Sequence, residues 1–469
     1  MPDDVIQNYT FDELAIGASA ALTQTLTLDD FKLFAAVSGD PVLSGNAEWV
    51  SPPGALGKRP AHAALSGTLL SRLVGTQMPG PGSSIVAESL RYAYAVGVGD
   101  SVTVSVKVVE KRPQGNIVVL ECSGVNQHGD PVLTGTMEVS VLTQKVSVAR
   151  MPTATISVQE HDSYENILKF CKHLPAVVTA VAHPCDVSSL TAVMDATKAN
   201  LIVPILVGPS ERIRKVAADF GFDISQMRIE NTPHSHASAA RAVELVREGE
   251  AEVLMKGSLH TDELMSAVVS SSTGLRTGRH ISHVFIMDVP TYDKPLFVTD
   301  AAVNIYPTLE QKVDIVQNAI DLAHALRIEC PKVAILSAVE TVTPKIQSTL
   351  EAAALCKMAD RGQITGGLLD GPLAMDNAIS KEAAEIKKIA SPVAGDADIL
   401  LVPDLEAGNI LAKQLTFMAN ADAAGIVLGA RVPIILTSRA DNLHARLASC
   451  AVAVVLAHAR REAKAAPPV

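Results

Sequence analysis

The sequence predicts two folded parts of different class, an α+β domain followed by a larger α/β domain with a doubly wound, mostly parallel sheet. A chain of 469 residues is too long for one hydrophobic core. Residues 1–147 contain strand-like runs and one long helical segment, whereas from residue 150 onward short apolar runs alternate with Ala-rich amphipathic segments. The change of pattern places the domain boundary near residue 150.

In the first part, the segment 61–75 is the one long helix that the pattern predicts. Its apolar residues recur at helical spacing, at Leu65, Leu69, Leu70, Leu73 and Val74. Turn sequences at 97–100, 112–116 and 128–130 separate the strand-like runs that follow, as in an antiparallel meander. We expect a central helix with an antiparallel sheet around it. The runs are IVAESLRYAYAV, SVTVSVKVVEKR, NIVVLECSGVNQ and PVLTGTMEVSVLT.

In the second part, short and β-branched apolar runs predict strands that are covered on both faces. Amphipathic segments such as HASAARAVELVREGE, residues 236–250, lie between most of them. In such sheets the ligand lies beyond the carboxyl ends of the strands, so polar residues that follow strands are the candidates for a site. The runs are AVVTAVAH, LIVPILVGP, AEVLMKG, HVFIMDVP, PLFVTDAAVNI, KVAILSAVE, ADILLVPDL, GIVLGA and VPIILTSRA.

Composition and motifs exclude several classes of function. The net charge is -11 and no basic block is present, which argues against a nucleic-acid partner. The acidic start lacks the apolar core of a signal peptide, and no apolar run reaches membrane-spanning length, so we expect a soluble, cytoplasmic protein with no membrane partner. The six cysteines form no C-x-x-C pair and no metal-ligand cluster is seen. Walker and G-x-G-x-x-G motifs are absent, so neither nucleotide hydrolysis nor hydride transfer is indicated.

The polar residues at the strand ends have the chemistry of a site for anion handling and acyl transfer. Arginine offers a planar fork for phosphate oxygens, glycine lets backbone N–H groups approach an oxyanion, and a carboxylate can take a proton from a thiol. Taken singly, a strand-end Asp is as often a helix cap, and an arginine such as Arg276 or Arg279 is as often part of a structural ion pair. The candidates are Lys256, Gly257, Ser258, His260, Arg276, Arg279, Ser282, Asn304, Asp370, Asp376, Ser438, Arg439 and Asp441.

Residues 150–469 resemble the phosphate acetyl/butyryltransferase family along nearly their whole length. The matching stretches include GLRTGRHISHVFIMDVP, VTDAAVNIYP, LLDGPLAMDNA, VPDLEAGNILAKQL and LTSRAD. The resemblance implies reversible transfer of an acyl group between coenzyme A and inorganic phosphate, with both as substrates and no tightly bound cofactor or metal. It assigns Arg439 to the phosphate oxygens and Ser438 to the reacting carbonyl. Lys256, Gly257, Ser258, His260 and Asn304 would line the cleft, and Asp370 and Asp376 match the Asp-Gly-x-x-x-x-Asp segment of the family.

The resemblance also implies two subdomains that enclose a cleft, about residues 150–283 with 432–469 and about residues 284–431. One departure concerns the base for the CoA thiol. In the acetyltransferases of the family an Asp follows the Arg by six residues, and here that position is Ala445. Asp441, His444 and Asp376 are the substitutes, and the local string TSRADN is closer to the butyryltransferase-type branch. The acyl chain and the base are therefore left open.

The first part resembles the MaoC-like hydratases, which have the hotdog fold and add water to a trans-2-enoyl-CoA. The matching stretches are FAAVSGD and AHAALSGTLLSRLVGTQMPGPGSSIVAESLRYAYAVGVGDSVTV. The family pairs an Asp with a His five residues later on one loop, and here Asp40 is present but Gly45 takes the place of the His. His62 and the N–H of Ala63 match the family's oxyanion-hole region. The resemblance implies a homodimer.

Three hypotheses follow. The first is a phosphate acyltransferase joined to a MaoC-like domain that has lost its catalytic pair. The second is a bifunctional enzyme that also hydrates enoyl-CoA. The third is a non-enzymatic acyl-CoA-binding or assembly protein, which the intact Ser438-Arg439 pair and the Asp370 and Asp376 positions disfavour.

Overall fold

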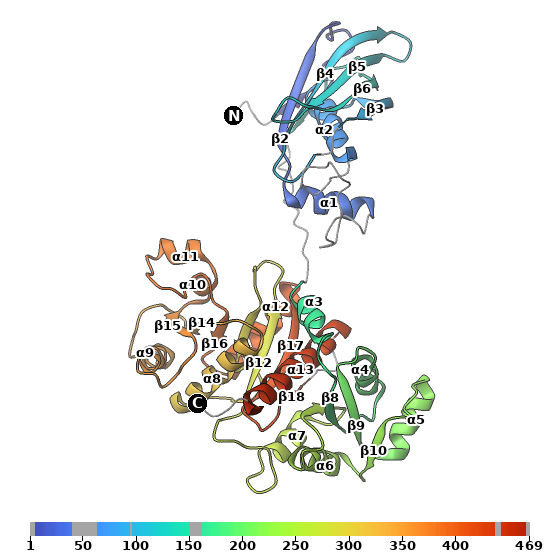
Figure 1. Cartoon of the computed structure of the whole chain (residues 1–469). Coiled ribbons are helices and arrows are strands. Elements are labelled where there is room, and N and C mark those ends of the chain that lie inside the picture. The colour runs from blue at the N-terminus through green and yellow to red at the C-terminus, as the bar shows by residue number, and fades with distance from the viewer. Residues whose placement is uncertain (1–4, 40–62, 94–95, 150–161, 437–441, 466–469) are drawn as a thin grey trace. The chain divides into compact units, whose positions relative to one another are not determined.

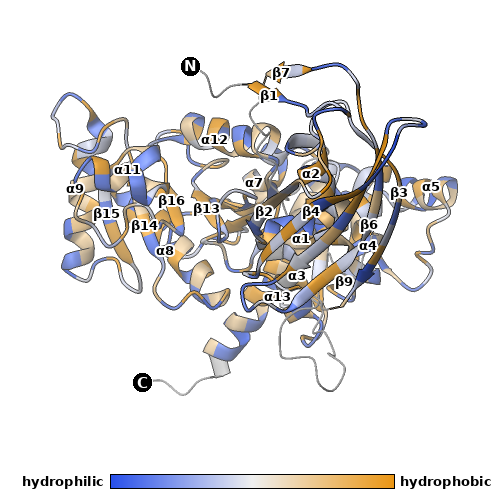
Figure 2. Ribbon diagram, turned by 90° about the horizontal axis from the view of Figure 1, so that it is seen from above, coloured by the Kyte–Doolittle hydropathy of each residue, from blue (hydrophilic) through white to orange (hydrophobic). Residues whose placement is uncertain are grey.

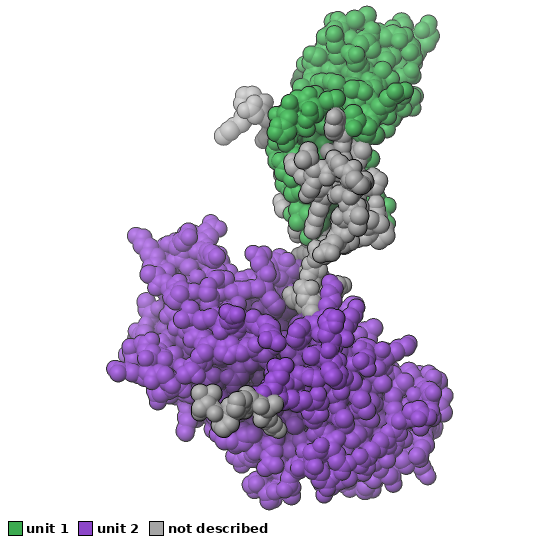
Figure 3. Space-filling view, viewed as in Figure 1, with its two compact units in different colours: residues 1–158 green, residues 159–469 purple. Residues whose placement is uncertain are grey.

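The chain divides into two compact units, residues 1–158 and 159–469 (Figures 1 and 3). The computed structural model describes residues 5–39, 63–93, 96–149, 162–436 and 442–465. None of the helices in these ranges is long and apolar enough to cross a membrane. Each unit has its own hydrophobic core.

The first unit is an antiparallel sheet packed around a central helix, which is the predicted hotdog arrangement. The sheet order in the described residues is β2-β4-β5-β6-β3, with the long helix α2 (Ala63–Thr76) packed against it. Val102, Val104, Val106 and Val108 alternate along β4 and are all at most 1% exposed, so one face of the sheet forms the core. The strands are β2 (Ser19–Thr25), β3 (Ser84–Tyr92), β4 (Ser101–Arg112), β5 (Ile117–Val125) and β6 (Pro131–Ser140).

The predicted meander is correct for β4, β5 and β6 but wrong for β3. That strand pairs with β6 at the far edge, and β2, which the sequence pattern did not reveal, takes the place beside β4. The reason lies in the turn at 97–100. The Gly99 N–H donates to the Leu26 carbonyl and the Leu26 N–H to the Asp100 carbonyl, so this turn is bonded to the end of β2.

Smaller elements complete the first unit. Helix α1 (Leu28–Ser38) begins at Thr27, whose side chain accepts from the Asp30 N–H while the Asp30 carboxylate accepts from the Thr27 N–H. The short strands β1 (Val5–Gln7) and β7 (Ser147–Ala149) pair antiparallel and bring the two ends of the unit together.

The second unit is built on one continuous sheet of 11 strands in the described residues, in the order β10-β9-β8-β11-β18-β17-β12-β13-β16-β14-β15. All neighbours are parallel except three central pairs, β18 with β17, β17 with β12 and β12 with β13. The strands are β8 (Val177–Ala182), β9 (Ile202–Gly208), β10 (Arg228–Asn231), β11 (Val253–Lys256), β12 (Ser282–Asp288), β13 (Leu296–Thr299), β14 (Lys332–Leu336), β15 (Leu368–Leu373), β16 (Ile399–Leu401), β17 (Asp422–Leu428) and β18 (Ile434–Ile435).

The three antiparallel pairs reverse the direction of half the sheet. Strands β8, β9, β11 and β18 point one way, whereas β13, β16, β14 and β15 point the other way. Their carboxyl ends therefore lie at opposite edges of the sheet. The polar residues that follow these strands are therefore divided between two edges of the sheet.

Helices cover both faces of this sheet, as a doubly wound fold requires (Figure 2). On one face, Val284, Ile286 and Ile426 pack in a core with α8 and α13. On the other face are two separate cores, one with α6 and α7 and one with α10 and α12. The helices are α3 (Asp162–Cys171), α4 (Val187–Lys198), α5 (Ser210–Phe220), α6 (Ser235–Arg247), α7 (Thr261–Val268), α8 (Leu309–Ala325), α9 (Gln347–Asp360), α10 (Met375–Ile379), α11 (Lys381–Ile386), α12 (Leu405–Met418) and α13 (Leu443–Ala465).

Candidate functional site

The turn that follows β11 is the best-defined part of the candidate site. The Gly257 N–H donates to the Ala182 carbonyl at 2.8 Å and the Ser258 N–H to the His183 carbonyl at 2.9 Å, so the turn is bonded to the end of β8. A Cβ on Gly257 would lie 2.4 Å from the Ala182 oxygen, which only glycine avoids. Because β11 pairs with β18 in parallel, the turn lies beside the end of β18, and Ser438 follows in sequence shortly after.

Two buried hydroxyl groups and a buried imidazole lie beside this turn. Nδ1 of His183 lies 3.0 Å from Oγ of Ser238, which lies 2.8 Å from Oγ1 of Thr232, and all three residues are buried. The Ser258 hydroxyl donates to the His183 carbonyl at 2.8 Å. Burial, with a smaller effect of the Arg212 charge, lowers the pKa of His183. His183 is therefore neutral near pH 7 and holds the turn in place.

The first turns of α6 and α7 meet at Glu263, close in sequence to this turn. The His260 N–H donates to the Glu263 carboxylate at 3.1 Å, and the Ser235 hydroxyl donates to it at 3.0 Å. Nδ1 of His236 lies 3.3 Å from the same carboxylate. The contacts fix the start of both helices, and the N–H groups of a helix start suit an anion. His260 itself is exposed.

Asn304 belongs to a second fixed loop, after β13. Its side-chain amide donates to the Asp300 carboxylate at 2.5 Å and to the Ile281 carbonyl at 2.8 Å. Asp300 is 2% exposed and also accepts from the N–H groups of Ala302 and Val303. Burial raises the pKa of Asp300 while these N–H groups oppose the rise. Asn304 is held as a structural clamp between two loops.

Between the two cores on the face that carries α7 and α12 lies a strip of sheet with a buried histidine. His283 pairs with Val427 across β12 and β17, so the two side chains share this face. The His283 ring packs edge-to-face on Phe285 with centroids 4.4 Å apart, and its Nδ1 has no hydrogen-bond partner in the described chain. Burial lowers the pKa of His283 to about 3. A Cβ on Gly425 would lie 3.0 Å from its Nε2, so glycine leaves room for the ring.

The structure places Arg279 and Ser282 against α8, on the opposite face of the sheet. Arg279 forms an ion pair with Asp321, which is the structural alternative that the sequence left open for this residue. Ser282 is fully buried and accepts from the Asn318 side chain at 2.9 Å. Arg276 is exposed and its backbone bridges to Ala430. Neither Arg279 nor Ser282 faces the strip that carries His283.

Asp370 and Asp376 also lie away from the β11 turn. Asp370 is half-buried on the edge strand β15, where its carboxylate accepts from the Gly371 N–H at 2.8 Å. Asp376 is exposed in α10 and its carboxylate lies 3.1 Å from Nζ of Lys387. This hydrogen bond lowers the pKa of Asp376, so the group is a weak base. Both carboxylates have local structural partners.

Several predicted residues lie outside the described part of the chain. These are Asp40, Gly45 and His62 in the first unit and Ser438, Arg439 and Asp441 in the second. Ala63 is the first residue of α2. The described chain resumes at Asn442, whose side chain accepts from the Ala445 N–H at 2.8 Å at the start of α13. His444 is exposed there.

Sequence reasoning missed three of the buried polar residues described above: His183, Ser238 and His283. The two histidines lie at the end of an apolar run, where a polar residue is costly to bury unless it has a role. That signal was present in AVVTAVAH and in HVFIMDVP, which have a histidine at one end.

The fold of the second unit is that of an α/β protein of the phosphotransacylase class. The crystal structure of a branched-chain phosphotransacylase from Enterococcus faecalis V583 is 31% identical with a TM-score of 0.54, and covers 60% of this chain and 99% of that chain. Residues 234–454 match the phosphate acetyl/butaryl transferase family. A phosphate acetyltransferase of Rhizobium meliloti is 63% identical over 303 residues, which is 65% of this chain and 96% of that protein.

The chain therefore belongs to the phosphate acetyl/butyryltransferase family and is an acyltransferase. The solved structure of the (R)-hydratase PhaJ1 from Pseudomonas aeruginosa matches the region of the first unit. It is 35% identical, covers 33% of this chain and 99% of that chain, and has a TM-score of 0.31.

Proposed function

We propose that the second unit transfers an acyl group reversibly between coenzyme A and inorganic phosphate, within a ternary complex. The observation that carries the proposal is the similarity to a phosphate acetyltransferase over nearly the whole length of that relative. The Gly257 turn, with its backbone N–H groups bonded to β8, supplies a rigid wall beside the strand that leads to Ser438 and Arg439.

The reaction needs positioning and charge stabilisation more than bond activation. A phosphate oxygen attacks the carbonyl carbon of the acyl thioester, the new C–O bond forms, and the C–S bond breaks as the sulfur leaves as thiolate and takes a proton. Both donors, thioester and acyl phosphate, are already activated, so direct transfer requires no covalent enzyme intermediate. The protein has to hold both ligands and stabilise the tetrahedral oxyanion.

We assign the roles as follows. Arg439 binds the phosphate oxygens with its planar fork, and Ser438 donates to the reacting carbonyl. Lys256, Gly257 and Ser258 form the adjacent wall. His260 lies at the start of α7, and Asn304 fixes the loop after β13. Asp441 and Asp376 are the candidates for the base that takes the proton of the CoA thiol. Arg276 and Asp370 are candidates for substrate binding, whereas Arg279 and Ser282 are assigned to the packing of α8.

The test is release of CoA from acetyl-, propionyl- and butyryl-CoA in the presence of phosphate. Arg439→Ala should lower kcat/KM by at least about 100-fold, the usual loss when one transition-state contact is removed. Arg247→Gln, at an exposed position in the last turn of α6, is the matched control and should keep the parent activity. Parent-like turnover by Arg439→Ala would refute the proposal, and the ranking of the three substrates assigns the acyl chain.

For the first unit we propose an acyl-CoA-binding or assembly domain without hydratase activity, because Gly45 stands where the hydratase family has its histidine. The alternative is a bifunctional enzyme. Loss of enoyl absorbance with crotonyl-CoA separates the two. The parent chain should show no hydration, and Gly45→His should raise the rate if Asp40 is competent. Full hydratase activity of the parent would support the bifunctional alternative.

We also propose that the first unit forms a homodimer through strand β3. This strand lies at the edge of its sheet and is exposed along nearly all its length, with Val86 at 59% and Tyr92 at 40%. A long exposed edge strand with apolar side chains is a template for pairing with another chain. Val86→Lys should shift the chain from dimer to monomer in sedimentation, whereas Val109→Lys, at an exposed site on β4, should not. A monomeric parent chain would contradict the proposal.

A further inference from the structure

A cavity of about 570 Å³ lies on the face of the second unit that is opposite to His283. Its walls are the loop before β12, the connection between β17 and β18, and the helices α8 and α13. Asn318, which lines it, donates to Ser282, and Ser282 pairs with Leu428 on the α8 face of the sheet. The β11 turn is not part of this cavity.

Three arginines line this cavity, Arg279, Arg431 and Arg460, against one carboxylate, Asp321. The carboxylate is taken by Arg279 in an ion pair. Arg460 is half-buried and uses Nη1 to donate to the Arg431 carbonyl at 2.9 Å. In the described chain neither Arg431 nor Arg460 has a carboxylate within ion-pair distance. The lining therefore keeps a net charge of about two positive units.

Arg460 is held in a setting that favours an anion. Burial lowers the pKa of its guanidinium, with the neighbouring Arg279 acting in the same direction and Asp321 opposing it. A partly desolvated guanidinium is costly unless charged or hydrogen-bonding partners satisfy it. Its guanidinium is held by two backbone carbonyls of the connection between β17 and β18, because Nη1 also donates to the Ala430 carbonyl at 3.4 Å. The Arg460 guanidinium is therefore held at the wall of the cavity and does not turn into solvent.

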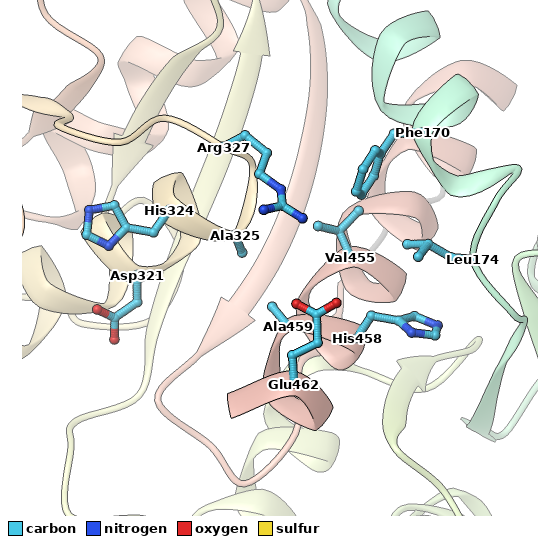
Figure 4. Close-up of a pocket in the computed structure, with 10 residues that line it drawn as sticks. All are labelled: Phe170, Leu174, Asp321, His324, Ala325, Arg327, Val455, His458, Ala459 and Glu462. Atoms are coloured by element: carbon cyan, nitrogen blue, oxygen red, sulfur yellow. The ribbon is translucent and has the colours of Figure 1, made fainter. Parts of the chain in front are cut away.

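A second cavity of about 340 Å³ adjoins the first and shares Asp321, Ala325 and Ala459 with it. Figure 4 shows Phe170 of α3 and Leu174, which follows that helix, on one side of it, with Val455 of α13 beside them. The Arg327 guanidinium carbon lies 5.9 Å from the centre of the Phe170 ring. An exposed aromatic ring beside a cation suits a flat, partly apolar group. Two of the three shared lining residues, Ala325 and Ala459, have small side chains.

We propose that these joined cavities form a binding site for a small organic anion that carries at least two negative charges, as phosphate or carboxylate groups. The charged groups would bind at Arg431 and Arg460, and the organic part would extend towards Phe170. The joined volume, roughly 900 Å³ by the sum of the two cavities, is in the range of small-molecule sites. The site is separate from the one that transfers acyl groups.

The experiment is calorimetric titration of the full chain, with CoA at saturation, using three probes. Inorganic pyrophosphate carries phosphate charge alone, citrate carries carboxylates, and ADP joins a pyrophosphate to an aromatic base. At least one probe should bind in the micromolar to low millimolar range. Arg460→Gln should weaken it at least about tenfold, the usual cost of one charge-assisted hydrogen bond. If Phe170→Ala weakens the binding of ADP but leaves the binding of pyrophosphate unchanged, the organic part of the ligand binds beside Phe170.

Controls separate this site from the acyltransferase site. Arg439→Ala should leave probe binding unchanged, as should Arg247→Gln. Ala463→Glu, at an exposed lining position, adds a negative charge without removing a contact and should weaken binding like Arg460→Gln. Binding that is lost in Arg439→Ala but kept in Arg460→Gln and Ala463→Glu would overturn the proposal, as would no binding of any probe.

Discussion

Gly257→Ala is the sharpest test of the candidate site, because the structure leaves no space for a side chain there. A Cβ would lie 2.4 Å from the Ala182 oxygen, 2.6 Å from the His183 oxygen and 2.7 Å from the His183 carbonyl carbon. All three are backbone atoms, so no rotamer change relieves the contact. To reach ordinary van der Waals distance the end of β11 must move by about 1 Å away from β8.

That movement has a calculable cost. It strains the hydrogen bonds from the Gly257 and Ser258 N–H groups to β8, each worth about 1 kcal/mol, and adds an overpacking cost of about 1–3 kcal/mol. A loss of about 3 kcal/mol corresponds to a drop of about 5 °C in Tm for a unit that spans residues 159–469, because its unfolding entropy is about 2.1 cal/mol/K per residue. A displacement of 1 Å in a site that works by positioning can lower kcat/KM by about 100-fold.

The assay is differential scanning calorimetry of the full chain together with CoA release. Because the two units have separate cores, the transition of the first unit should stay unchanged and serve as an internal reference. Gly278→Ala is the matched control, since nothing lies within 4 Å of its added Cβ. If Gly257→Ala melts within about 1 °C of Gly278→Ala and keeps its activity, the turn is not rigid and the reasoning fails.

Three further predictions test other parts of the chain. Lys312→Met should cost about 3–5 kcal/mol in unfolding by urea, because it leaves Glu351 partly buried without its cation, and adding Glu351→Leu should recover most of the loss. Hydrogen bonds from Lys332 and Lys294 lower the pKa of Asp396 to about 2, so its stabilising effect should be complete above about pH 4 and lost as pH falls towards 2, a dependence that Asp396→Asn should lack in acid unfolding. Cys330 is exposed while the other five cysteines are buried or half-buried, so a thiol reagent should label Cys330 first in the native chain. Faster labelling of any of the other five cysteines would contradict the structure.

The fold class was predictable because it depends on local patterns. The alternation of Val102, Val104 and Val106 requires a strand with one buried face, and the family resemblance of the second part was carried by long matching stretches. The direction of each strand was not predictable in the same way. The run PLFVTD has the same composition whether its strand is parallel or antiparallel to its neighbours, and only the pairing of β13 with β12 sets the direction.

The same limit applies to the candidate site residues. The strand-end rule selected Lys256, Gly257 and Ser258, which lie at the end of a strand whose neighbours share its direction, and their role stays a prediction. The rule does not apply to Arg279, because that residue precedes a strand and its partner Asp321 lies in a helix 42 residues later. A sequence pattern contains no information about which face of a sheet such a pair will occupy. His283 was missed because an isolated polar residue in an apolar run is more often structural.

The replacement of the family's aspartate by Ala445 is expected to lower the rate of acyl transfer without abolishing it. The Ala445 N–H is bonded to Asn442 and the residue is 6% exposed, so this position contributes no proton acceptor. A thiol with a pKa near 8.5 is about 3% thiolate at pH 7, so loss of the base costs about 30-fold, or about 2 kcal/mol, of the 8–23 kcal/mol that enzymes supply. Without a base, the rate of CoA acylation by acyl phosphate should rise about tenfold per pH unit from pH 6 to 8. A flat profile over that range would instead show that a carboxylate or a neutral histidine takes the proton.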